Sequence, residues 1–385
     1  MEVSRARLRP VLPACLSALA LALVLLAAGC DYWSGTVRIG FSGTITGLSS
    51  DLGVQGRNGA TLAVEELNAA GGIAGRRVEL LVADENDTPE AARAAVRELD
   101  RQGAAVVVGL MSSTTALAGL PEAEAAGLAV ISSTATTTAL TGKDDAFFRV
   151  SSDAAAYALA LARLVADQTG RGGVLLLRSD DNPAFVESFS GAFAASYARL
   201  GGRAAGEARI PAGQTPDAPA LVRQARAADA AAVVAICSPR ELAGLLRELR
   251  PAAPDLRIYS SFWGLTPEFL EMAGAAAEGV TSCVPYPFDD HSPRVADFNA
   301  RFQRRFGYPP SYDGAMCYEA VLVAARALEL THGRRQGVAR ALAGLGPVPG
   351  VLGDIVFDRF GDVSRPVFCS QVRGGRVRTL GTDNG

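Results

Sequence analysis

Short apolar runs alternate with longer amphipathic stretches from residue 36 onward. TVRIGF, RVELLVAD and AAVVVGL have the length and composition of buried strands, and NGATLAVEELNAAGG repeats apolar residues at helical spacing before two glycines end it. Thr88 and Pro89 then begin another helix, as a cap and a first-turn proline. Strands that alternate with helices in this way predict a parallel sheet covered by helices on both faces.

The same rhythm starts again after FFRV (147–150), and no low-complexity linker divides the two halves. The pattern changes near GVTSCVPYP (279–287), beyond which two helices precede two more strand-like segments. We therefore predict an α/β fold of two lobes, with FFRV, TSCVP and RPVFC as the crossings between them. The elements expected in this part are helices at 154–168, 185–200, about 293–306 and 312–331, and the strands GVLLLRS, EARIP, AAVVAIC, RIYSS, GDIVFD and PVFCSQV.

The N-terminus has the layout of a secretory signal. Basic MEVSRARLR precedes the uncharged apolar run VLPACLSALALALVLL, and the small residues AAG lead to Cys30. A cleaved signal peptide at 1–29 is one interpretation. An uncleaved membrane anchor is the alternative, because the apolar stretch is long enough to span a bilayer. Pro13 and Ser17 interrupt the stretch, and Cys30 stands at the cleavage point, so we favour cleavage.

Hydroxyl residues crowd the ends of two neighbouring strands. VVVGLMSSTT places Ser112 to Thr115 after the third strand, and LAVISSTATTTALT places Thr134 to Thr136 after the fourth. Ligands of open parallel sheets bind beyond the carboxyl ends of strands, and a helix N-terminus favours an anion. Two such sites side by side could clamp one carboxylate. The alternative is that these residues only cap helices.

Composition excludes several other classes of function. The net charge of −3 and the absence of a basic run argue against a nucleic-acid surface, although Lys143 is the single lysine among 37 basic residues. No P-loop, G-x-S-x-G or G-x-G-x-x-G motif follows a strand, and His291 and His332 are the only histidines. We therefore expect the protein to have no enzymatic activity and to bind no cofactor or metal. The cysteines after Cys30 are far apart in apolar settings, which favours buried free thiols: Cys237, Cys283, Cys317 and Cys369.

Several of these stretches together resemble a known family. GFSGTITG, LGVQGRNGATLAVEELNAAGGIAGRRVEL, GLMSSTTALA, ISSTATTTALT and DIVFDRFGD are similar to the solute-binding proteins of branched-chain amino acid type ABC importers. The resemblance covers about residues 36–380. AAG-Cys30 likewise resembles a lipobox, with Ala27 where that motif prefers Leu, which implies a lipid-anchored extracytoplasmic protein.

The resemblance implies the type I periplasmic binding fold: two doubly wound parallel-sheet lobes joined by three hinge crossings, with the ligand closed between them. It assigns residues 36–149 and 285–363 to lobe I, and residues 150–284 and 364–381 to lobe II. It also implies a monomer that delivers an amino acid or organic acid to a membrane permease. The first-lobe disulfide of some members is expected to be absent, because Ser112 and the segment DENDT occupy the corresponding places.

The resemblance also assigns roles at the site. Ser113 and Thr136 match residues that hold the ligand's α-carboxylate, Ala135 matches a main-chain contact, and Ser112 lies beside them. Phe185 falls where the family often has a tyrosine on the second lobe, with Leu52 where an aromatic often lines the first.

One departure bears on the ligand. Amino-acid binders of the family place a Glu against the ligand's ammonium, whereas Phe262 followed by Trp263 stands at that position here. A buried ammonium without an acidic partner is costly. A carboxylate with an apolar or aromatic body is therefore expected to bind better than the amino acid of equal size, unless another acid replaces the Glu. The candidates for that role are Asp180, Asp181, Glu241, Asp313 and Glu319.

Two further alternatives stay open. Phe262 and Trp263 could be ordinary core residues at a strand end rather than walls of a site. A transport receptor and a ligand sensor of the same fold that signals to a membrane partner would also share all of these residues.

Overall fold

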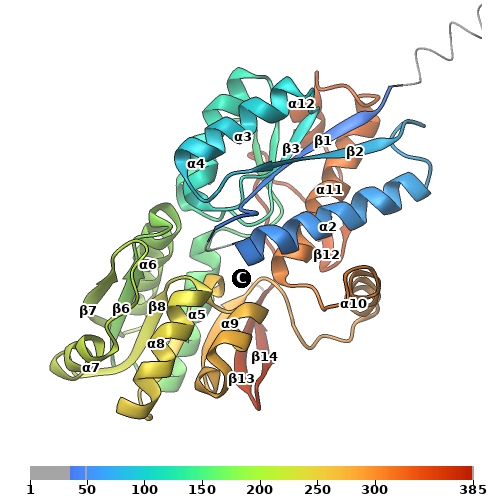
Figure 1. The fold of residues 1–385 in the computed structure, drawn as a ribbon. Coiled ribbons are helices and arrows are strands. Elements are labelled where there is room, and N and C mark those ends of the chain that lie inside the picture. Colours follow the sequence, from blue (N-terminus) through green and yellow to red (C-terminus); the bar gives the residue numbers. More distant parts are fainter. Residues whose placement is uncertain (1–34, 48–49, 384–385) are drawn as a thin grey trace, which may run out of the picture.

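The computed structural model describes residues 35–47 and 50–383, which form two α/β lobes, each built on its own sheet (Figure 1). The predicted signal peptide and Cys30 lie outside the described residues. Among the described helices, none has both the length and the apolar character that a membrane crossing requires.

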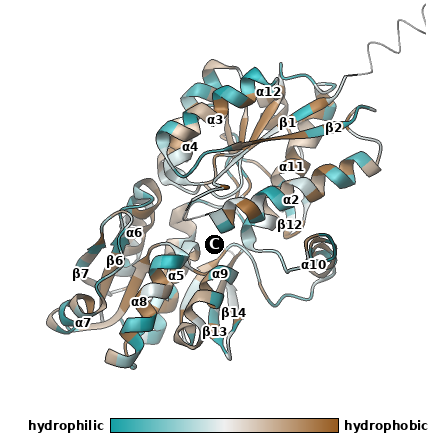
Figure 2. Cartoon of the chain, in the orientation of Figure 1, coloured by the Kyte–Doolittle hydropathy of each residue, from teal (hydrophilic) through white to brown (hydrophobic). Residues whose placement is uncertain are grey.

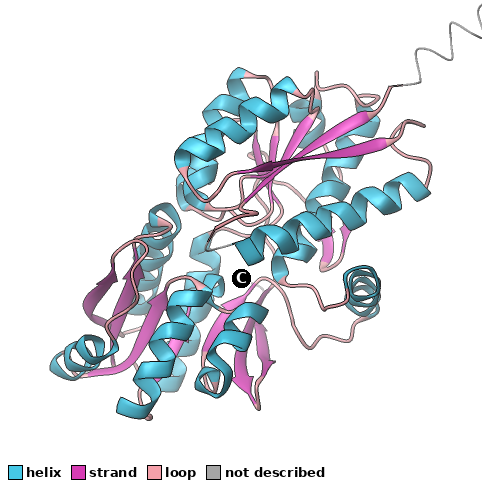
Figure 3. Cartoon of the chain, in the orientation of Figure 1, coloured by secondary structure: helices cyan, strands magenta, loops and turns pink. Residues whose placement is uncertain are grey.

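Lobe I contains a five-stranded parallel sheet in the order β2-β1-β3-β4-β5. All four residues of β3 are buried, as expected for a strand covered on both faces. Figure 3 shows helices on both sides of these strands. The elements are β1 (Val37–Gly43), α2 (Ser50–Ala69), β2 (Val78–Asp84), α3 (Pro89–Arg101), β3 (Val106–Gly109), α4 (Ser113–Ala125), β4 (Val130–Ser132), the 3₁₀ helix Thr138–Leu140 and β5 (Phe147–Arg149).

Lobe II contains a seven-stranded sheet in the order β14-β13-β10-β9-β8-β6-β7. Its strands β6 to β10 are parallel, but β13 and β14 form an antiparallel hairpin at one edge. Gly374 and Gly375 supply the two positive φ angles of that hairpin's turn. The elements are α5 (Ala154–Thr169), β6 (Gly173–Ser179), α6 (Pro183–Arg199), β7 (Arg203–Ile210), α7 (Ala218–Ala227), β8 (Ala230–Ile236), α8 (Pro239–Ala252), β9 (Arg257–Ser260), the 3₁₀ helices Phe262–Gly264 and Gly274–Ala277, α9 (Pro267–Ala273), β10 (Thr281–Val284), β13 (Val367–Arg373) and β14 (Arg376–Asp383).

Part of lobe I comes from the C-terminal third of the chain. In Figure 1, α11 lies beside α2, and a Cβ on Gly59 of α2 would lie 1.9 Å from the carbonyl oxygen of Gly314 in α11. The chain therefore crosses between the sheets three times: after β5, after β10 and before β13. The lobe boundaries given above stay a prediction. The remaining elements are α10 (Pro293–Phe306), α11 (Tyr312–Leu330), α12 (Val338–Ala343), β11 (Val348–Gly350) and β12 (Gly353–Ile355).

The hydropathy of the chain follows this layered arrangement. In Figure 2 the sheet strands are largely brown, and several outward helix faces are teal.

A buried ion pair fixes the third crossing, where Arg365 Nη2 lies 3.0 Å from both carboxylate oxygens of Glu319.

The prediction of free thiols is wrong for two of the four cysteines. Cys283 of β10 and Cys369 of β13 form a disulfide, whereas Cys237 and Cys317 are free and buried. The two paired cysteines are direct partners in the antiparallel register of β10 and β13. They are 86 residues apart in sequence, and only the return of β13 to the edge of this sheet brings them together.

Candidate ligand-binding site

A cavity lies between the lobes, at the carboxyl ends of strands from both sheets. It holds about 500 Å³ that no protein atom occupies, part of it open to solvent. This is the position where ligands of open α/β sheets bind. The lining residues are Thr44, Leu52, Gly53, Asp87, Met111, Ser112, Ser113, Thr134, Asn182, Phe185, Phe262, Trp263, Tyr312 and Asp313.

The turn between β3 and α4 forms the polar edge of the cavity. Gly109 has φ 126°, and a Cβ there would lie 1.9 Å from the carbonyl oxygen of Ser42, so the turn needs glycine. Ser112 caps α4, because its Oγ accepts the backbone N–H of Thr115 at 3.1 Å while Thr115 Oγ1 accepts the N–H of Ser112. Ser112 is thus a helix cap, which was the alternative role considered for these hydroxyl residues, and it also lines the cavity.

Ser113 has a different function in the turn. Its Oγ accepts the backbone N–H groups of Thr136 at 3.3 Å and Thr137 at 3.1 Å. A hydroxyl has two acceptor positions and one hydrogen, so this arrangement leaves the hydrogen of Ser113 to donate. The side chain is 1% exposed and lines the cavity at the first turn of α4, where an acceptor with negative charge is favoured.

The second hydroxyl loop contributes differently from what the resemblance implies. Thr134 lines the cavity, but Ala135 and Thr136 are not among its lining residues. The N–H of Ala135 donates to Ser132 Oγ at 3.1 Å, so this group is already occupied. Thr136 Oγ1 is buried and has no hydrogen-bond partner among the described residues. This unpaired hydroxyl stands next to the N–H that Ser113 accepts.

Glu85 supports the polar edge from beneath. Its Oε1 accepts the N–H of Met111 at 3.0 Å and Thr115 Oγ1 at 2.9 Å, and its Oε2 accepts Ser42 Oγ at 2.9 Å. Burial raises the pKa of Glu85 to about 7, against the opposing hydrogen bonds from Ser42 and Thr115. No sequence pattern pointed to Glu85, because an acid after a strand ordinarily lies in a solvated loop.

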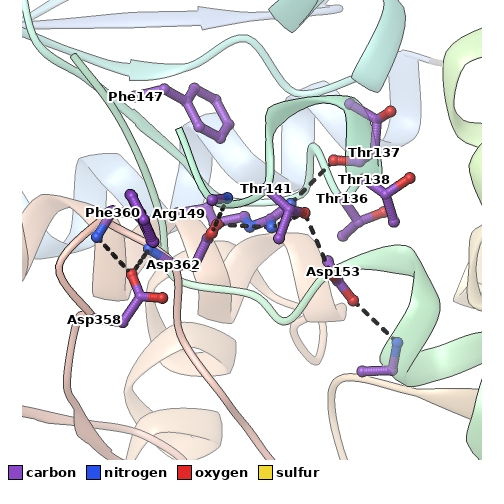
Figure 4. Close-up of polar contacts among 12 residues, drawn as sticks. Thr136, Thr137, Thr138, Thr141, Phe147, Arg149, Asp153, Asp358, Phe360 and Asp362 are labelled. Atoms are coloured by element: carbon purple, nitrogen blue, oxygen red, sulfur yellow. Dashed lines mark hydrogen bonds and ion pairs between the residues drawn. The ribbon is translucent and has the colours of Figure 1, made fainter. Parts of the chain in front are cut away.

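Arg149 fixes the loop that follows β4 (Figure 4). Its Nη1 donates to the carbonyl of Thr137 at 3.2 Å, and its Nη2 donates to Thr141 Oγ1 and pairs with Asp362, each at 2.7 Å. Asp362 in turn belongs to a turn whose N–H groups bond to Asp358. The guanidinium is 1% exposed and ties the hydroxyl loop to the start of the third crossing.

Aromatic rings form the lobe II wall of the cavity. The ring of Phe185 lies 5.2 Å from that of Phe262 and 5.9 Å from that of Trp263, measured between centroids. Phe262 also contacts Tyr312 of lobe I at 5.8 Å, in a T-shaped arrangement. Leu52, from the first turn of α2, lines the lobe I side. This wall suits an apolar or aromatic ligand body.

Hydrogen bonds join the two lobes along one rim of the cavity. Thr114 Oγ1 donates to Asn182 Oδ1 at 3.0 Å. Ser188 Oγ of α6 lies 2.8 Å from Thr137 Oγ1 and accepts the N–H of Thr138 at 3.2 Å. The structure is therefore a closed form, in which both lobes contact each other around the site.

Only one of the five candidate acids lines the cavity. Asp313 is 1% exposed, and Ser311 Oγ donates to its Oδ2 at 3.2 Å. Burial, and after it the charge of Asp51, raises the pKa of Asp313 well above its ordinary value. Burial and a hydrogen bond with Glu268 raise the pKa of Asp51 to about 7.

The other four acids are engaged elsewhere. Asp180 forms a salt bridge with Arg209, and Glu319 forms one with Arg365. Asp181 accepts a hydrogen bond from the N–H of Gly213, and Glu241 accepts hydrogen bonds from the hydroxyls of Ser238 and Ser179. In residues 35–47 and 50–383, no group of three or more acids, histidines or cysteines is arranged to hold a metal ion.

Comparison with known proteins places this arrangement in a family. A sequence model described as periplasmic binding protein matches residues 36–376. The chain belongs to the periplasmic binding protein family. Its fold and family are those of solute-binding proteins and not of an enzyme.

Curated relatives of this periplasmic binding protein match over shorter stretches. It is 30% identical over 108 residues to the leucine-, isoleucine-, valine-, threonine- and alanine-binding protein of Pseudomonas aeruginosa, covering 28% of this chain and 29% of that protein. It is 36% identical over 96 residues to an amino acid binding protein of the same organism, covering 25% and 26%. The match thus spans less than a third of either relative's length.

Solved structures share the fold over nearly the whole chain. The branched-chain amino acid transporter substrate binding protein LivJ of Streptococcus pneumoniae, in complex with isoleucine, has a TM-score of 0.81 at 23% identity, covering 91% of this chain and 99% of that one. A solute binding protein of an ABC transporter from R. palustris, in complex with benzoate, has a TM-score of 0.82 at 17% identity, covering 90% and 96%. These likenesses establish the type I periplasmic binding fold.

Proposed function

We propose that this periplasmic binding protein is the extracytoplasmic receptor of an ABC importer. It binds an amino acid or a related small carboxylate between its lobes and passes it, as a monomer, to a membrane permease. The observation that carries the proposal is the donor at Ser113, which is buried in the cavity with both acceptor positions filled by backbone N–H groups. Such a donor is matched to an anionic acceptor that enters from solvent.

The walls support a ligand with an apolar body. Phe185, Phe262 and Trp263 would cover its side chain, with Leu52 opposite. Ser112 and Ser113 would line the carboxylate end, which Thr136 braces through its N–H to Ser113. Related structures of the same fold contain isoleucine in one case and benzoate in another. Both ligands combine a carboxylate with an apolar body.

A thermal-shift screen of amino acids against aliphatic and aromatic carboxylates tests this function, because a ligand that binds only the folded state raises its stability. The best ligand is then titrated into the Ser113→Ala variant. We expect affinity to fall by about ten- to a hundredfold, since the lost hydrogen bond goes to a charged group. The matched control is Ser190→Ala, a buried serine of α6 that does not line the cavity. Unchanged affinity in Ser113→Ala would refute the assignment.

We also propose that lipid on Cys30 anchors the mature protein to a membrane. The support is the apolar run followed by AAG-Cys30. Cys30→Ser should move the protein from the membrane to the soluble fraction, because several acyl chains anchor stably and none would remain. Unchanged membrane retention of this variant would contradict the anchor.

A further inference from the structure

We propose that Asp313 selects the charge of the ligand by pairing with its ammonium group, so that the ligand is a zwitterion rather than a simple carboxylate. This inference rests on the proposed function and makes it more specific. It also favours the second of the two alternatives that the sequence left open, in which another acid replaces the missing Glu.

The location of Asp313 is the first argument. It is the one acid among the five candidates that lines the cavity, which it shares with Ser113. It follows Tyr312, whose ring contacts Phe262 at 5.8 Å. Phe262 stands where the resemblance places the ammonium-binding Glu. A carboxylate on α11 of lobe I thus lies near the position at which lobe II lacks one.

The charges around Asp313 are the second argument. Within the described residues, no arginine, lysine or histidine forms a salt bridge with Asp313 or Asp51. Asp51 Oδ1 is buried and has no hydrogen-bond partner there. An unpaired buried carboxylate is costly, and an entering cation would remove that cost. A ligand with only a carboxylate would bring no positive charge with which either acid could pair.

The titratable groups that act on this part of the cavity come from several elements. Asp51 lies in α2 and hydrogen-bonds to Glu268 of α9. Glu268 Oε1 in turn lies 3.8 Å from Arg240 Nη2. The remaining groups are Asp87 at the cavity wall, Glu85 and Cys317 behind it, and the phenols of Tyr312 and Tyr157. Arg240 is the single cation of this set, and it faces Glu268 rather than Asp313.

Binding should therefore release a proton. Burial favours the neutral carboxyl of Asp313 in the empty cavity. When the ammonium group arrives with its own protons, the O–H bond of Asp313 breaks, the proton leaves to the buffer, and the ion pair forms. Because a proton is released, the affinity for the zwitterion rises with pH by at most tenfold per pH unit.

Isothermal titration of the full-length mature protein tests the proposal with two ligand pairs: phenylalanine against 3-phenylpropanoate, and leucine against 4-methylpentanoate. We expect the amino acid to bind at least about tenfold more tightly in at least one pair. Titration in phosphate and in Tris, which have different ionisation enthalpies, should show release of up to about one proton with the amino acid. These measurements need only the wild-type protein.

The Asp313→Asn variant adds the residue-level test. It should lose about tenfold or more in affinity for the amino acid, lose less for the deaminated analogue, and release no proton. Glu241→Gln is the matched control, because it also neutralises a buried acid but lies outside the cavity. It should not change the preference between the two members of a pair.

The outcomes separate this inference from the function beneath it. If the deaminated acid binds as well as the amino acid in both pairs, or if Asp313→Asn affects both members equally, the role of Asp313 is overturned and the carboxylate receptor stands. If no member of either pair binds and the wider screen also yields no carboxylate, both proposals are overturned.

Discussion

On the lobe I side of the cleft, hydroxyl groups reach the ligand space from two loops, whereas on the lobe II side three aromatic rings line it. The hydroxyl edge is held from behind by hydrogen bonds, because Glu85 binds the β3–α4 turn and Arg149 binds the loop after β4. The aromatic wall is held by packing, since the ring of Phe262 contacts that of Phe185 in a T-shaped arrangement and that of Tyr157 in a tilted one.

This difference determines which substitutions each side of the cleft tolerates. Hydrogen bonds in a buried network depend on atom positions, so losing one acceptor leaves several donors unsatisfied. Packed rings depend on volume, so the cost of a change follows the size of the hole. Substituting one side chain on each side of the cleft therefore tests the two kinds of support separately.

The largest effect is expected from Phe262→Ala. The ring is 4% exposed and contacts Tyr157 at 4.7 Å, so its removal leaves a large hole between α5, the cleft and lobe I. We expect a loss of about 3–5 kcal/mol in the free energy of unfolding, measured by urea denaturation. Leu330→Ala is the control, because that side chain is 63% exposed and its removal should cost little. A loss below about 1 kcal/mol for Phe262→Ala would contradict its place in the packed wall.

On the hydroxyl side, the strongest effect is expected from Glu85→Ala. The change removes an acceptor of three buried hydrogen bonds, each worth about 1 kcal/mol, so a loss of about 3 kcal/mol in unfolding free energy is expected. Ligand affinity should fall as well, because the turn that carries Ser113 loses its support. Glu79→Ala, which removes a half-exposed acid of β2, the strand that Glu85 follows, should change neither quantity by more than about 0.5 kcal/mol. Equal effects of the two substitutions would show that Glu85 does not support the turn.

Much of the fold could be predicted from the sequence, for a physical reason. Buried parallel strands such as VVVG are continuous apolar runs, and the helices between them carry an apolar stripe, so both are visible locally. The hairpin of β13 and β14 was partly missed, because β14 (RVRTLGTD) mixes polar and apolar residues at an exposed sheet edge. The Cys283–Cys369 disulfide was not predicted either, because it depends on the antiparallel pairing of β13 with β10 across 86 residues of sequence.

The candidate site divides in the same way. Ser112, Ser113, Phe185, Phe262, Trp263 and Leu52 do line the cavity, and strand ends or the resemblance pointed to each of them. Glu85 and Arg149 contact segments that lie further along the sequence, and Asp313 lines the cavity from the C-terminal third of the chain. No local pattern marks a buried acid or arginine. Among five acids of similar local setting, only the three-dimensional arrangement could single out Asp313.

The pH dependence of stability gives a separate test of the hydroxyl side, with an effect that is small over any one pH unit. The pKa of Glu85 rises from its ordinary 4.5 to about 7 on folding, mainly through burial. Between these values the folded state holds a proton that the unfolded state has released, so stability falls as pH rises from about 4.5 to 7. One such group contributes at most about 1.4 kcal/mol per pH unit. Glu85→Gln, which stays neutral, should flatten this part of the curve measured by urea denaturation, and an unchanged slope would argue against a buried neutral carboxyl.

The smallest effect is expected where the two sides of the cleft meet. Ser188 of α6 bonds to Thr137 and Thr138 of lobe I, yet it is not a lining residue of the cavity. Ser188→Ala therefore removes a contact that exists only while the lobes are closed, and leaves the ligand's own contacts in place.

A lost hydrogen bond of about 1 kcal/mol in the closed state predicts about fivefold weaker binding, because ligand affinity includes the free energy of closure. The unfolding free energy should hardly change if the lobes separate without it. Ser190→Ala on the same helix is the matched control, since among the described residues its hydroxyl bonds within α6, to the carbonyl of Glu187. Weaker binding in Ser188→Ala alone would show that the contacts of Ser188 stabilise the closed lobes. Equal binding in both variants would mean that the ligand, and not these contacts, holds the hydroxyl edge against the aromatic wall.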